Sequence, residues 1–399
     1  HSKASRARQA RAVVPVARTG ASLHRVGLLG MRSPELRLPV LGSKGEKSNR
    51  RTPVETMAYS WTSTDDGVSS DRVGVLHEAE VIEGVPLPYN VLNLKVIYPL
   101  ESVSNAQTPV VIFWGAANID PSNYRWLASN LACAGFVVVL TSSVSLIAGQ
   151  PNLMPTFYDS SCFESEERFA EGAAAPGLRA TLAALGRINA GGPLAGRLDL
   201  GSVALGGHGV GGRAALELAC YGENFDQISA CFTYGASLVN DPIGHDGPFY
   251  PPVGGVLPFR AGHPPLLMMG GTRDGVVGMY SKRTGEIDPL DTLRRSIQEG
   301  VVGEESTSMA CLVALRGASH SMPTYPGEPN AAYHGMDMVP EGSVDNQREL
   351  FSHLVRNFLD AYVAPPDWPT RSRIQKVAGI TYWPPAEIFH PLIDELSIR

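Results

Sequence analysis

The segment Gly206–Gly212 has the residue types and spacing of a turn that carries a catalytic nucleophile. It follows a short apolar run and precedes a segment rich in alanine and leucine, so we expect a strand, a sharp turn and a helix. In the pattern G-x-S-x-G a nucleophilic serine stands at the tip of such a turn. Here the glycines are present, but Gly209 occupies the serine position. Because glycine has no side chain, no acyl-enzyme can form at this position.

An acidic and a basic residue follow two later apolar runs. Asp274 comes after the expected strand 266–270, and His320 comes after the expected strand 310–315. In a catalytic triad the carboxylate orients the imidazole, which takes a proton from the nucleophile. Taken singly, Asp274 also fits an Asp-Gly turn, and His320 also fits an ordinary loop histidine. The order of turn, acid and base after separate strands favours a triad that lacks only its nucleophile.

Glycine is physically suited to the tip of this turn. A nucleophile at such a tip has a strained backbone conformation, whereas glycine adopts that conformation without steric cost. Replacement of a serine by Gly209 would therefore remove strain and keep the fold. We interpret Gly209 as a natural loss of catalysis rather than an engineered substitution, for which alanine is the usual choice.

The elements that would position these residues alternate between strands and helices. An antiparallel hairpin comes first, and strand–helix–strand units follow as far as a final amphipathic helix. This order predicts one α/β domain with a doubly wound, mostly parallel sheet and an N-terminal antiparallel hairpin. The expected strands are 73–83, 91–98, 109–115, 136–141, 203–205, 228–234, 266–270 and 310–315, and the expected helices are 123–133, 178–188, 212–221, 293–299 and 343–363.

By composition the chain divides into four parts. These are a basic arm (1–57), a linker (58–72), the α/β domain (73–363) and a tail rich in aromatic residues and proline (364–399). The arm is rich in arginine and poor in acidic residues, which is typical of an organelle transit peptide. If the mature protein retains the arm, we expect it to bind an acidic protein or an anionic lipid. We expect the tail to pack on its own domain or to dock on a partner.

Charge is distributed unevenly along the chain. The formal net charge is −6, but the first 52 residues hold 12 of the 33 Lys and Arg and 2 of the 39 Asp and Glu, a balance of +10. The remaining residues therefore have a balance of −16, which argues against a nucleic-acid-binding role for the domain. No apolar run reaches the roughly 18 residues that a membrane-spanning helix needs. We therefore expect a soluble or peripheral protein.

The sequence predicts neither a metal nor a cofactor. His334 and Asp337, and likewise His245 and Asp246, lack a third ligand at a useful spacing. The glycines of 207–212 are similar to a dinucleotide-binding fingerprint, but no acidic residue ends a following strand about 20 residues later. The five cysteines are an odd number at wide spacing, so we expect reduced, buried thiols rather than disulfides.

Three motifs of the chain are shared with a known group of enzymes. Residues 207–212 read G-H-G-V-G-G, residues 110–139 form the first strand–helix–strand unit, and the acid and base follow in order. Chlorophyllases, cutinase-like PET hydrolases and their dienelactone-hydrolase relatives carry G-H-S-x-G-G and a similar first unit. Residues 73–363 therefore resemble the α/β-hydrolase fold. The resemblance implies hydrolysis of carboxylic esters in active relatives, and it covers neither the basic arm nor the tail.

The oxyanion side of the expected site also departs from this family. The family has His-Gly after the first central strand, where this chain has Trp114 followed by glycine. Trp114 is bulky at a place that should face the substrate. His208, which precedes the tip and points into the domain, is the second residue expected at the pocket. The resemblance still allows an oxyanion hole formed by the backbone amides of Ala116 and Val210.

Three functions are open on the sequence alone. The first, which we favour, is a catalytically silenced protein that serves as a structural or assembly subunit of an organelle complex through the arm and the tail. The second is an ester hydrolase with a non-standard nucleophile. The third is a protein that binds a hydrophobic ligand such as a tetrapyrrole or a phytol ester without turnover. The replacement nucleophiles to consider are His208, Ser319, Ser142, Ser143, Ser145 and a water activated by the acid–base pair. The chlorophyllase resemblance favours a plastid over a mitochondrion.

Overall fold

The computed structural model describes residues 58–59, 72–82, 91–102, 106–141, 172–221, 226–240, 251–300, 308–328, 331, 333–368, 376–377, 380–381 and 390–398. Residues Pro53–Arg399 form one compact unit. The expectations for the basic arm, and for His245 and Asp246, lie outside the described residues. Among the helices of the described ranges, none is both long and apolar enough to cross a membrane.

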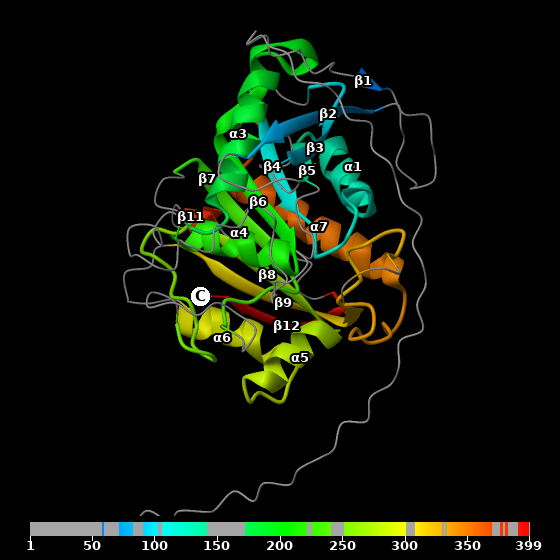
Figure 1. Ribbon diagram of the computed structural model, residues 1–399, viewed down its shortest axis with the longest axis vertical. Helices are drawn as coiled ribbons and strands as arrows, with labels where there is room; N and C mark the ends of the chain where they lie inside the picture. The colour runs from blue at the N-terminus through cyan, green and yellow to red at the C-terminus, as the bar shows by residue number, and fades with distance from the viewer. Residues whose placement is uncertain are drawn as a thin grey trace, which may run out of the picture. The chain divides into compact units, whose positions relative to one another are not determined.

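A ten-stranded sheet runs through this unit in the order β1-β2-β3-β5-β4-β6-β7-β8-β9-β12 (Figure 1). Neighbouring strands from β5 to β9 are parallel, whereas the pairs β2–β3, β3–β5 and β9–β12 are antiparallel. The predicted α/β-hydrolase fold with its N-terminal hairpin is therefore confirmed. The strands of the sheet are β1 (Ala58–Tyr59), β2 (Val73–Val81), β3 (Val91–Pro99), β4 (Thr108–Trp114), β5 (Val137–Thr141), β6 (Leu198–His208), β7 (Ile228–Tyr234), β8 (Leu266–Arg273), β9 (Ala310–Ser319) and β12 (Ile393–Ile398).

Helices cover both faces of the sheet (Figure 1). Successive strand residues point to opposite faces, so an apolar strand needs a cover of helices on each face. In β4, Val110 and Ile112 lie in one core cluster with apolar residues of α3, α4 and α6. Val111 and Phe113 lie in the other cluster with apolar residues of α1 and α7. The α-helices within the described residues are α1 (Arg125–Cys133), α3 (Ala175–Ala190), α4 (Val210–Tyr221), α5 (Gly275–Arg283), α6 (Asp291–Gly300) and α7 (Val344–Tyr362), of which α5 was not expected from the sequence.

Part of the expected tail belongs to the domain. Trp368 is buried, and its ring centroid lies 5.4 Å from that of Phe136. Strand β12 pairs with β9 at the edge of the sheet, and Glu395 of β12 forms a 2.7 Å ion pair with Arg294 of α6. The expected linker likewise contributes β1, which pairs with β2. The boundaries predicted at 72 and 363 therefore do not separate structural units, because distant segments complete both ends of one sheet.

Gly186 lies in the interior of α3 on its exposed side. Apart from its chain neighbours and the backbone of α3 itself, no described atom lies within 4 Å of the place that a Cβ atom would take there. Glycine in a helix interior costs about 0.5–1 kcal/mol relative to alanine, because it loses more conformational freedom on folding. We expect Gly186→Ala to raise the free energy of unfolding by about 0.5–1 kcal/mol, measured by urea denaturation followed by circular dichroism. A lower free energy of unfolding for Gly186→Ala than for the native chain would contradict the open space described beside residue 186 of α3.

Candidate functional site

The segment with the vacant nucleophile position forms a sharp turn between β6 and α4. Strand β6 ends at His208, Gly209 has a φ of +54°, and α4 begins at Val210. The Gly209 amide donates to the Tyr234 carbonyl (2.9 Å), and the Gly209 carbonyl accepts from the Arg213 amide (2.9 Å) in the first turn of α4. A turn from strand to helix with positive φ at its tip has the geometry of a nucleophile elbow. Gly209 therefore stands where a nucleophile would be presented.

The acid and the base expected from the sequence lie in hydrogen-bond contact. The Nδ1 atom of His320 is 2.9 Å from Oδ2 and 3.1 Å from Oδ1 of Asp274. Both side chains are buried, with exposed fractions of 2% for His320 and 0% for Asp274. Asp274 also caps α5, because its Oδ1 accepts the amide of Val277 at 2.8 Å. The Asp274 carboxylate thus orients the His320 imidazole and also caps the N-terminus of α5.

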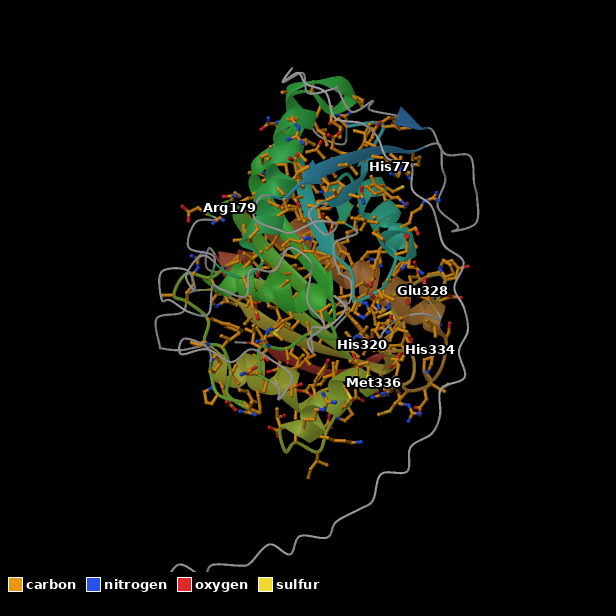
Figure 2. All side chains as sticks on the ribbon, in the orientation of Figure 1. His77, Arg179, His320, Glu328, His334 and Met336 are labelled. Carbon is orange, nitrogen blue, oxygen red and sulfur yellow. The ribbon has the colours of Figure 1, made fainter. Side chains whose placement is uncertain are left out.

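A second carboxylate fixes the two loops that carry this pair. Oδ1 of Asp337 accepts the amides of His320 (2.8 Å) and Gly275 (3.3 Å), and Oδ2 accepts the amide of Ser321 (2.8 Å). Figure 2 labels His320 and Met336, the residue that precedes Asp337. The sequence pattern singled out Asp337 only as a weak metal ligand, whereas the described residues contain no cluster of three metal-ligating side chains. Its role as a tie between loops has no local sequence signal, because its partners are backbone amides from distant segments.

The free edge of the imidazole faces the tip of the turn. A Cβ atom on residue 209 would lie 3.1 Å from Nε2 of His320 and 3.3 Å from Cβ of Ala116. A side chain at this position would therefore reach the base directly, as a triad nucleophile must. Both distances are tighter than ordinary Cβ contacts, so a serine here requires its neighbours to shift by a few tenths of an ångström. The imidazole thus fills part of the space that a nucleophile would need.

The first of the two expected oxyanion donors already has a partner. The Ala116 amide donates to the hydroxyl of Tyr124 at 2.9 Å, and both residues are buried. An amide has a single proton, so it cannot also donate to a ligand in the site while this bond persists. The second expected donor, Val210, is half-buried at the first position of α4. In this arrangement the Ala116 amide is not free to bind an oxyanion.

The two residues expected at the pocket are fully buried. Nδ1 of His208 lies 2.9 Å from the Tyr124 hydroxyl, and the ring centroid of His208 is 4.5 Å from that of His320. Burial, and then the neighbouring His320, lower the pKa of His208 well below its usual range, so its imidazole is neutral. Trp114 lies in the core cluster that contains Ile112. Because strand residues alternate between faces, Trp114 packs into the core instead of narrowing an open pocket.

The replacement nucleophiles within the described ranges are enclosed by the protein. The Ser319 hydroxyl is buried and lies 3.0 Å from the hydroxyl of Ser321. Cys220 and Cys231, which were expected as reduced, buried thiols and not as nucleophiles, are free and buried, and burial raises the pKa of both thiols, which disfavours the reactive thiolate. The remaining serine candidates, Ser142, Ser143 and Ser145, lie outside the described residues.

The structure of this chain is similar to solved structures of esterases. No protein-family model and no curated protein sequence matches the chain. The chain is similar to a structure of Thermogutta terrifontis esterase 2 phosphoramylated by tabun, with 17% identity, a TM-score of 0.44 and coverage of 72% of this chain and 96% of that chain. It is also similar to a ferulic acid esterase from Streptomyces cinnamoneus, with 16% identity, a TM-score of 0.44 and coverage of 75% and 93%, respectively. The fold assignment itself rests on the strand order and the elbow.

Proposed function

We propose that this protein is a catalytically silenced α/β-hydrolase-fold protein that works by binding, as a structural or assembly subunit of an organelle complex. The tip of the elbow carries the proposal, because Gly209 offers no nucleophile to the imidazole of His320, which lies against it. The engaged Ala116 amide supports it, since ester hydrolysis needs free oxyanion donors. Without the nucleophile, only the residual acceleration from binding and oxyanion groups would remain.

The basic arm is the main contact segment of this proposal. Its balance of +10 in the first 52 residues suits an acidic protein surface or an anionic lipid, whereas the rest of the chain is acidic. The tail is a weaker candidate than the sequence indicated, because β12 and Trp368 are taken up by the domain. The composition of the arm and the chlorophyllase resemblance together favour a plastid over a mitochondrion.

The native chain is expected to hydrolyse p-nitrophenyl butyrate no faster than its His320→Gln variant. No acyl-enzyme can form on Gly209, so no burst of p-nitrophenolate should precede the steady state. Stopped-flow and steady-state absorbance at equal protein concentration measure both quantities. The His320→Gln variant is the matched control, because glutamine retains a donor for Asp274 while lacking a general base. A burst, or a rate that depends on His320, would overturn the proposal of a silenced site.

The subunit role is tested separately by the size of the native particle. We expect the full chain to elute with a large assembly from organelle extracts and a chain lacking residues 1–52 to elute as a free protein. A chain of full length in which the 12 Lys and Arg of that segment are replaced by Gln is the matched control for length. It should behave like the deletion if charge drives assembly. Elution of the full chain as a free monomer would contradict the subunit role.

The retained hydrogen bond between His320 and Asp274 favours a second candidate, hydrolysis by an activated water. This candidate predicts a slow rate that is lost in His320→Gln and shows no burst, because no covalent intermediate forms. Binding of a tetrapyrrole or phytol ester without turnover is the third candidate. A pigment or lipid that co-purifies in stoichiometric amount would favour that candidate over both others.

A further inference from the structure

A tyrosine side chain closes the oxyanion side of the site. Tyr124 ends the 3-10 turn Pro121–Tyr124 directly before α1, and its side chain is 1% exposed. Its ring centroid lies 5.0 Å from that of Phe113. Gly115 leaves room for the ring, because a Cβ atom on residue 115 would lie 2.7 Å from Cε2 of Tyr124. The ring is therefore held tightly against the end of β4.

The hydroxyl of Tyr124 links two groups of the site, and the direction of its hydrogen bond with the amide follows from chemistry. The Ala116 amide can only donate, so the hydroxyl oxygen accepts that proton at 2.9 Å. The hydroxyl proton is then available to Nδ1 of His208, also at 2.9 Å. His208 is buried and neutral, so its Nδ1 accepts this proton in the tautomer that carries the ring proton on Nε2. The Tyr124 hydroxyl is thus engaged by both the Ala116 amide and the His208 imidazole.

We infer that Tyr124 is a second silencing element, independent of Gly209, because its hydroxyl occupies the position that a substrate oxyanion would take at the Ala116 amide. An oxyanion donor must lie 2.7–3.1 Å from the developing oxyanion, and the Tyr124 oxygen lies 2.9 Å from that amide. This inference rests on the proposed function, since it concerns the same silenced site. It adds that restoring the nucleophile alone does not restore catalysis.

The expected reaction of a restored site shows why the second element matters. In a Gly209→Ser variant the serine oxygen would attack the carbonyl carbon of the ester, and its proton would pass to Nε2 of His320. The electron pair of the carbonyl π bond would move to the carbonyl oxygen, which needs the Ala116 and Val210 amides. On collapse, the pair returns and p-nitrophenolate leaves with the electrons of the cleaved bond. His320 then releases its proton to solvent, and a water attacks the acyl carbon while its proton passes to Nε2. The C–O bond to the serine breaks, the serine oxygen takes that proton back, and butyrate leaves.

The test compares Gly209→Ser with the double variant Gly209→Ser/Tyr124→Phe on p-nitrophenyl butyrate. Loss of one oxyanion donor lowers kcat about 10²–10³-fold in a working hydrolase, so the double variant should be faster by about 10²-fold. Butylboronic acid supplies a readout without turnover, because the serine oxygen adds to boron and leaves an oxygen on the oxyanion side. Its dissociation constant, measured by ¹¹B NMR, should be lower for the double variant.

Tyr333→Phe in the Gly209→Ser background is the matched control. This change also removes one tyrosine hydroxyl from a ring that packs against His320, since the ring centroids of Tyr333 and His320 lie 4.7 Å apart. The Tyr124 hydroxyl, which accepts from the Ala116 amide, stays in place. We expect no gain in rate or in boronic acid affinity. An equal gain in the control, or equal rates and affinities for Gly209→Ser with and without Tyr124→Phe, would overturn the inference.

One further variant and the single variant by itself keep the result decisive. Gly209→Ser/Tyr124→Leu also lacks the hydroxyl and serves if the phenylalanine variant does not fold by circular dichroism. Gly209→Ser alone tests the inference even without a double variant, because strong boronic acid binding and a burst from this single variant would overturn it. The proposed function fails by a different observation, namely hydrolysis by the native chain that depends on His320.

Discussion

Gly207→Ala is expected to destabilise the native fold strongly. A Cβ atom on residue 207 would lie 2.5 Å from the backbone C and O atoms of Gly211 and from the N atom of Gly212. These atoms belong to the first turn of α4, so they cannot move aside without opening the elbow. Overpacking typically costs about 1–3 kcal/mol and more against rigid atoms, while domains are stable by only about 5–15 kcal/mol. We expect a loss of at least about 3 kcal/mol.

The yield of soluble protein and urea denaturation followed by circular dichroism measure this effect. Gly186→Ala is the matched control, since it is the same change at a place where the new Cβ atom would meet no described atom within 4 Å besides its chain neighbours and the backbone of its own helix. Gly211→Ala should fail in the same way as Gly207→Ala, because its Cβ would lie 2.4 Å from the carbonyl oxygens of Trp114 and Gly115. An unfolding midpoint of Gly207→Ala equal to that of the native chain would show that β6 and α4 do not meet as described.

His320→Ala is expected to destabilise the protein strongly, although the site is silent. The change removes the hydrogen bond to Asp274 and leaves that carboxylate, which is 0% exposed, with the Val277 amide as its side-chain partner. It also removes a ring that packs against the rings of His208 and Tyr333, whose centroids lie 4.5 and 4.7 Å from that of His320. Removing one partner of a buried polar pair costs about 3 kcal/mol when the other is ionised.

The free energy of unfolding from urea denaturation at neutral pH checks this prediction. His353→Ala in α7 is the matched control, because His353 is exposed and a surface change usually stays within about 0.5 kcal/mol. Equal stability of His320→Ala and His353→Ala would contradict a structural role for the buried pair. A large loss would explain how an acid and a base persist without a nucleophile, since Asp274 caps α5 and orients a core side chain.

The sequence by itself determined the fold class, the elbow and the order of Gly209, Asp274 and His320. These features depend on local patterns: apolar runs of strand length, glycines at a sharp turn, and a helix that follows at once. Short-range pattern also predicted the closing helix, for which Ser343 is the N-cap. The close approach of Asp274 to His320 followed from topology, because the carboxyl ends of parallel strands meet at one edge of the sheet.

Only the tertiary structure decided which groups contact one another around this turn. The hydroxyl of Tyr124 engages the Ala116 amide, and Asp337 ties the loops of the acid and the base together. Trp114 is turned into the core by strand alternation, and β12 pairs with β9 across a long stretch of sequence. Side-chain type and spacing cannot specify such contacts, because each one joins segments that are brought together only by folding. The local sequence pattern therefore indicated that the nucleophile is missing at Gly209. The long-range packing determined that the Tyr124 hydroxyl engages the Ala116 amide.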